Sequence, residues 1–84
     1  MRKIARSTRD MGRILAQYRQ DNSLSQAELA KQLNLHQTSI SRLEGGETNR
    51  VLDLVFKILS LLNLEIEVRP RKVNTPQDIA DMFR

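Results

Sequence analysis

Apolar residues recur at helical spacing over residues 8–62 and then alternate strictly with charged residues over residues 64–69. The first pattern predicts a series of short amphipathic helices, and the second predicts one half-buried β-strand. Capping and turn-forming residues divide the helical part into segments of about 8–21, 26–33, 37–44 and 52–62. The chain is therefore expected to be mainly α-helical, with one C-terminal strand.

The clearest local signals lie between Ser25 and Gly46. Ser25 followed by Glu28 forms a capping box, so a helix should begin at Gln26. Asn34 tolerates a positive φ angle and can end that helix in a left-handed conformation. These signals predict two short helices joined by a tight turn, the arrangement of a helix-turn-helix unit.

The second helix of this pair carries a polar face. Ile40 and Leu43 are expected to face inward, and the other side presents Gln37, Thr38, Ser41 and Arg42. Glutamine can pair with adenine and arginine with guanine, while threonine and serine can contact base edges or a thymine methyl group. Such a face is also common on ordinary solvated helices. The capped helix and the turn before it favour reading of DNA bases.

These segments resemble the helix-turn-helix of phage repressors and their bacterial relatives. The resemblance is carried by Gln26, Ala27, Leu29, Ala30, Ile40, Leu43 and Glu44. It implies that the polar face of the second helix reads bases and that the flanking polar residues contact phosphates. The expected phosphate contacts are Gln26, His36, Ser39, Thr48, Asn49 and Arg50. The turn usually contains glycine in this family, and here it contains Asn34.

The helix predicted over residues 52–62 is apolar on more than one side, which indicates a second buried surface such as a dimer interface. The strand that follows places Leu64, Ile66 and Val68 on one face. No second strand is apparent in the sequence. The strand is therefore expected to pair with its copy in a second molecule, with these three residues holding the dimer.

The order of these parts resembles the HipB-type antitoxins across most of the chain, above all at Phe56-Lys57-Ile58-Leu59 and in the strand after Leu64. The resemblance implies a phage-repressor-like bundle of four to five helices whose strand pairs across a homodimer. It also implies a repressor that binds double-stranded operator DNA and restrains a HipA-like kinase toxin. The alternative is a stand-alone helix-turn-helix regulator without a toxin partner.

Charge and length refine this picture. The 84 residues carry a net charge of +4, and a chain of this length has room for one domain. Six basic residues lie in the stretch from Arg2 to Arg19 before the motif, and within this stretch only Asp10 opposes them. We divide the chain into a basic arm (1–7), a DNA-binding domain (8–63), a dimerisation strand (64–70) and a tail (71–84). The arm is either a solvated tail or an extension that contacts phosphates, and the adjacent motif favours the second.

The tail contains a helix-start signal at residues 75–78, and a short helix there could dock on the toxin through Ile79, Met82 and Phe83. A frayed end is the alternative. The sequence predicts no enzyme, cofactor or metal site, because it has no cysteine and His36 has no catalytic partner residues around it. It contains no membrane-spanning run, so we expect a cytoplasmic protein, on the nucleoid when bound to DNA. An RNA-binding role would normally use more aromatic residues than the three present.

Overall fold

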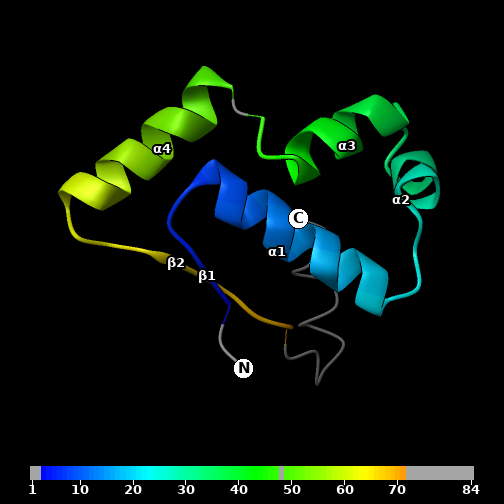
Figure 1. The fold of residues 1–84 in the computed structure, drawn as a ribbon, viewed down its shortest axis with the longest axis horizontal. Helices are drawn as coiled ribbons and strands as arrows, with labels where there is room; N and C mark the ends of the chain where they lie inside the picture. Colours follow the sequence, from blue (N-terminus) through cyan, green and yellow to red (C-terminus); the bar gives the residue numbers. More distant parts are fainter. Residues whose placement is uncertain (1–2, 48, 72–84) are drawn as a thin grey trace, which may run out of the picture.

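The computed structural model describes residues 3–47 and 49–71. Within these ranges the chain forms four helices and two short strands (Figure 1). The elements are β1 (Lys3–Ala5), α1 (Thr8–Asp21), α2 (Gln26–Gln32), α3 (Gln37–Glu44), α4 (Arg50–Leu61) and β2 (Ile66–Val68). The predicted mainly α-helical bundle is confirmed, and the fifth helix considered for the tail lies outside the described residues.

Polar side chains cap the start of three helices. Ser7 and Asn49 each accept the backbone N–H three residues on, at 3.0 and 2.8 Å. In α2 the predicted capping box is complete: the Ser25 hydroxyl accepts the Glu28 N–H, and the Glu28 carboxylate accepts the Ser25 N–H, both at 3.0 Å. Because Asn49 acts as a cap, α4 begins two residues before the predicted start at Leu52.

All four described helices end in the same backbone turn. A residue with positive φ stands two places after the last helical residue: Ser23 (57°), Asn34 (56°), Gly46 (84°) and Asn63 (60°). The next N–H returns to the carbonyl of the third-last helical residue, from Leu24 to Arg19, Leu35 to Ala30, Glu47 to Arg42 and Leu64 to Leu59. This pattern is the Schellman motif, and it confirms the left-handed conformation predicted for Asn34.

The main core joins β1, α1 and α4. Ala5, Ile14 and Phe56 are buried at its centre. Partly buried apolar side chains surround them: Met11, Tyr18, Leu52, Leu59, Ile66 and Val68. Burial of these side chains supplies the main free energy that holds the terminal strands and α4 on α1.

The expectation that β2 lacks a partner in its own chain is wrong. β1 and β2 form an antiparallel two-stranded sheet in which Lys3 faces Val68 and Ala5 faces Ile66 (Figure 1). Ile66 and Val68 contact the core of the same chain, and Leu64 is exposed and precedes the strand. The predicted basic arm thus contains a strand, and the unpaired-strand argument for a dimer no longer holds.

Close backbone contact joins α1 to α3. Gly12 is buried in α1, and an ideal Cβ built on it would stand 2.1 Å from the carbonyl oxygen of Leu43, near the end of α3. Only glycine allows the two backbones to approach this closely. This contact fixes the C-terminal end of α3 against the middle of α1.

Candidate nucleic-acid interface

The predicted base-reading side chains share one exposed face of α3. Gln37, Thr38, Ser41 and Arg42 are all exposed, while Ile40 on the opposite side is buried. Positions i, i+1, i+4 and i+5 lie on one side of a helix because each turn takes 3.6 residues. The structure therefore brings the four predicted residues together on a surface that a DNA groove can reach.

A buried ion pair ties this helix to α1. Arg19 donates from Nε to Glu44 Oε2 at 2.6 Å and from Nη2 to Oε1 at 3.0 Å. The two side chains are only 11% and 8% exposed. A third bond runs from Arg19 Nη1 to the carbonyl of Leu24, at 2.7 Å. This two-bond geometry is the strongest form of arginine–carboxylate contact, and it locks the end of α3.

The ion pair shifts the pKa of both partners. Hydrogen bonds from Arg19 lower the pKa of Glu44 below its ordinary value, although burial opposes the shift. The bond to Glu44 in turn raises the pKa of Arg19. Both groups therefore stay charged near neutral pH, which a buried pair requires.

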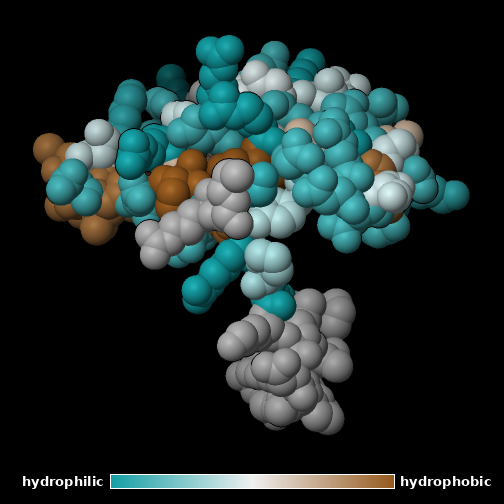
Figure 2. Space-filling model, turned by 60° about the horizontal axis from the view of Figure 1, so that its bottom comes forward, coloured by the Kyte–Doolittle hydropathy of each residue, from teal (hydrophilic) through white to brown (hydrophobic). Residues whose placement is uncertain are grey.

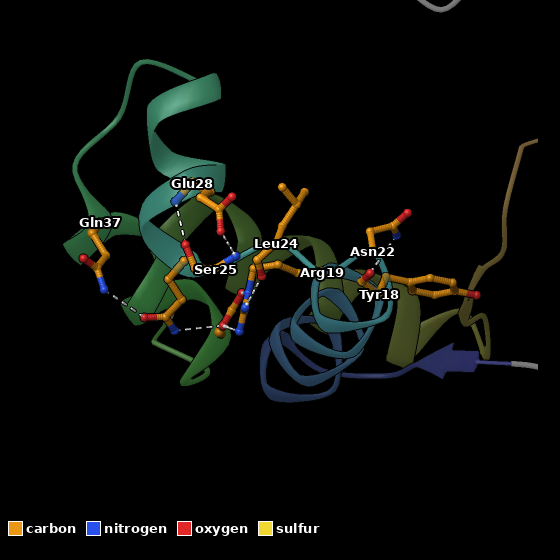
Figure 3. Close-up of polar contacts among 9 residues, drawn as sticks. Tyr18, Arg19, Asn22, Leu24, Ser25, Glu28 and Gln37 are labelled. Carbon is orange, nitrogen blue, oxygen red and sulfur yellow. Dashed lines mark hydrogen bonds and ion pairs between the residues drawn. The ribbon is translucent and has the colours of Figure 1, made fainter.

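Gln26 extends this network to the reading face. Its Nε2 donates to Glu44 Oε1 at 2.9 Å, and its Oε1 accepts from Gln37 Nε2 at 3.4 Å (Figure 3). An ionised carboxylate accepts only, so the amide nitrogen of Gln26 must face Glu44 and its oxygen must face Gln37. The Gln37 side chain is thereby oriented with its nitrogen toward Gln26 and its oxygen toward solvent.

Sequence reasoning did not find this network. Arg19 was counted among the basic residues before the motif, and Glu44 only as part of the family pattern. Arg19 and Glu44 are 25 residues apart, and no local period relates them. The one available signal was the carboxylate of Glu44 at the end of the predicted helix, where the adjacent residues are Leu43 and Gly45.

The predicted phosphate contacts lie at helix starts. His36 is the exposed cap residue of α3, without a side-chain capping bond, and Ser39 is exposed one turn later. Asn49 caps α4, and Arg50 is its exposed first residue. Backbone N–H groups at helix starts favour anions such as phosphate. Of the remaining candidates, Thr48 and the tail residues Ile79, Met82 and Phe83 lie outside the described residues.

Several of the basic residues near the N-terminus are already paired. Arg6 contacts Glu65 at 2.8 Å and Arg13 contacts Asp10 at 3.0 Å, and Arg19 belongs to the buried pair described above. Lys3 lies in β1 with its Nζ 5.5 Å from the centre of the Tyr18 ring. Among these three arginines, only the Arg19 charge is therefore buried in the fold, because the Arg6 and Arg13 side chains remain 74% and 72% exposed despite their partners.

Comparison with known proteins places these features in a family. Residues 10–71 match the model of a helix-turn-helix domain. The chain is 37% identical over 59 residues to Antitoxin HipB of Escherichia coli K12, a match that covers 70% of this chain and 67% of the relative. It is equally identical to Antitoxin HipB of Escherichia coli O6:H1 (strain CFT073), over 63% of that relative. No solved structure gives a significant match. Among the described residues, no helix has the length and apolar character needed to span a membrane.

Proposed function

Because this chain belongs to the helix-turn-helix family and, within it, to the HipB-type antitoxins, we propose that it represses its own operon and acts as the antitoxin of a HipA-like kinase toxin. The observation that supports DNA reading is the exposed polar face of α3, held to α1 by the Arg19–Glu44 ion pair. Side chains on a rigid element lose less conformational entropy on meeting base edges, because their backbone is already fixed.

In this proposal α3 enters the major groove. Gln37 reads an adenine and Arg42 a guanine, while Thr38 and Ser41 contact neighbouring base edges. Phosphate contacts come from the starts of the helices, at Gln26, His36, Ser39, Asn49 and Arg50. Thr48, which lies outside the described residues, is proposed as a further phosphate contact. For Gln26 this role is added to the orienting contact with Gln37.

Two arginine variants test this division of roles. Arg42→Ala should cost roughly 1–3 kcal/mol of binding free energy and relax preference at one base position, because a base contact is lost. Arg50→Ala is the matched control and should weaken cognate and random DNA about equally, because it contacts only phosphate. Binding-site selection on both variants distinguishes these results. An unchanged preferred sequence and affinity for Arg42→Ala would show that another face of α3 contacts DNA.

The exposed side of α4 supplies a dimer interface that the strand does not. Figure 2 shows apolar surface gathered at the end of the molecule where α4 lies. Val51 and Leu61 are 73% and 86% exposed. Further exposed apolar residues on or just after α4 are Leu54, Val55, Ile58, Leu62 and Leu64. Two copies of the chain related by a two-fold axis can bury this apolar surface against each other, without a different protein as partner. We therefore place the homodimer contact on α4.

A dimer of this kind presents two recognition helices to DNA, which predicts two half-sites about 34 Å apart. Leu61→Lys should convert the dimer to monomers at micromolar concentration, because it places a charge in the apolar interface. Leu33→Lys is the matched control, since it adds the same charge to an exposed leucine away from α4. Sedimentation of the two variants decides the matter. A monomeric wild-type chain, or an unchanged dimer with Leu61→Lys, would refute this interface.

The kinase-like toxin is the second partner in this proposal. We assign its contact to the tail, where Ile79, Met82 and Phe83 can supply apolar side chains to the toxin surface. Copurification with the product of the neighbouring gene, with and without residues 72–84, tests this role. If no neighbouring protein binds, the stand-alone regulator is the better description. If binding is unchanged without the tail, the antitoxin role stands and the tail has no part in it.

A further inference from the structure

The turn that ends α3 differs from the other three turns in one side chain. In each Schellman motif the residue after the positive-φ position lies beside the third-last helical residue, and a hydrophobic side chain usually occupies it. After the other described helices this residue is Leu24, Leu35 and Leu64. After α3 it is Glu47, and the residue beside it is Arg42, the proposed guanine reader.

The backbone fixes these two residues as neighbours. The Glu47 N–H donates to the Arg42 carbonyl at 2.9 Å, across Gly46 with its φ of 84°. A Cβ on Gly46 would stand 3.1 Å from the Cα of Arg9, so the turn is also held from the α1 side. The side chains meet as an ion pair, with Arg42 Nε 3.5 Å from Glu47 Oε2, and both are 68% exposed.

Arg42 pairs with Glu47 through Nε, which leaves its two terminal nitrogens available for a base contact. Arginine has five donors in a planar fork, and this ion pair faces Nε on the inner side of the guanidinium. The two terminal nitrogens are the ones that match guanine O6 and N7. A carboxylate beside Nε can therefore orient the fork without occupying the edge that reads the base.

We propose that Glu47 is a positioning and specificity-determining residue for DNA recognition, an inference that rests on the proposed function. Away from a cognate site, Glu47 competes with DNA phosphates for Arg42. Its negative charge also repels the DNA backbone, which weakens binding to DNA of random sequence. At a cognate site the Nε contact and the guanine contact are compatible, so Arg42 keeps both. The ratio of cognate to random affinity rises as a result.

The test compares Glu47→Gln with Glu65→Gln. Glu65 is a matched control, because it also pairs with the Nε of an exposed arginine, at 2.8 Å. Its partner is Arg6, which lies outside the proposed reading face of α3. Each variant removes one negative charge, so both should bind a random duplex more tightly. Only Glu47→Gln should lower the ratio of cognate to random affinity, by about two- to fivefold, the effect of one exposed ion pair. The difference should shrink at high salt.

Fluorescence anisotropy with the selected operator and a scrambled duplex gives both affinities, and binding-site selection gives the base preference. Glu47→Gln should broaden preference at the position that Arg42 reads, and in an Arg42→Ala background it should leave the affinity ratio unchanged. An equal ratio for wild type and both glutamine variants overturns this inference and leaves the proposed function intact. A wild-type chain without any sequence preference overturns both. Circular dichroism of Glu47→Gln should match wild type, because the side chain is exposed.

Discussion

Replacement of Gly12 by Ala tests the close backbone contact between α1 and α3. At an exposed helix position this change would stabilise the fold by about 1 kcal/mol, because alanine is the better helix former. Gly12 is buried, however, and a Cβ there would stand 2.1 Å from the Leu43 oxygen, about 1.3 Å short of the 3.4 Å at which ordinary contact begins. Gly12→Ala is therefore expected to destabilise the fold.

Neither side of the contact can move alone. The Leu43 carbonyl accepts the Gly46 N–H at 3.1 Å, and the next residue, Glu44, is held by its ion pair to α1. The clash must displace α3 as a unit. Overpacking costs about 1–3 kcal/mol, and the upper figure less the propensity gain of about 1 kcal/mol gives a loss of about 2 kcal/mol. For a domain of this size the melting temperature should fall by about 8–16 °C.

Urea unfolding followed by circular dichroism measures this loss. One fixed chain concentration is used, because the stability of the proposed dimer would depend on it. Gly45→Ala is the matched control. Gly45 has an ordinary φ of −77°, and its added Cβ would meet only Ser41 and Arg42 of its own helix, at 3.3 Å and beyond. Its unfolding free energy should change by less than about 1 kcal/mol. A Gly12→Ala variant as stable as wild type, or more stable, would refute the reasoning.

Three further variants probe the acid limb, the cap of α2 and the core. The hydrogen bond from Arg19 lowers the Glu44 pKa below its ordinary value of 4.5. The ion pair therefore stabilises the fold fully above about pH 4.5, and this stabilisation is lost as the pH falls through the lowered pKa. In Glu44→Gln the unfolding free energy should thus fall less steeply as the pH is lowered below about 4.5 than it does in wild type. An equally steep fall in both proteins would contradict this. Ser25→Ala should cost about 1 kcal/mol in thermal melts through loss of the α2 cap; no loss would argue against the capping box. Phe56→Ala should cost about 3–5 kcal/mol in urea unfolding, and a loss below about 1 kcal/mol would place Phe56 outside the core.

Local chemistry determined where the helices begin and end. A cap such as Ser25 acts on N–H groups within three residues, and Asn34 acts on its own φ angle, so the sequence contains both partners of each signal. For the same reason the outward face of α3 was predictable, since helical period alone places Gln37 and Arg42 on one side. The α4 start is an exception, because the apolar pattern predicts it at Leu52, whereas the Asn49 side chain caps the helix and α4 begins at Arg50.

Tertiary structure decided the features that join distant residues. β1 is three residues long, too short to show alternation, and its pairing with β2 closes a loop of some sixty residues. The partner of Arg19 and the close approach at Gly12 likewise depend on how α1 crosses α3. Such contacts form only when burial of the core offsets the entropy of loop closure. No local pattern records them, because their energy depends on the whole packed chain.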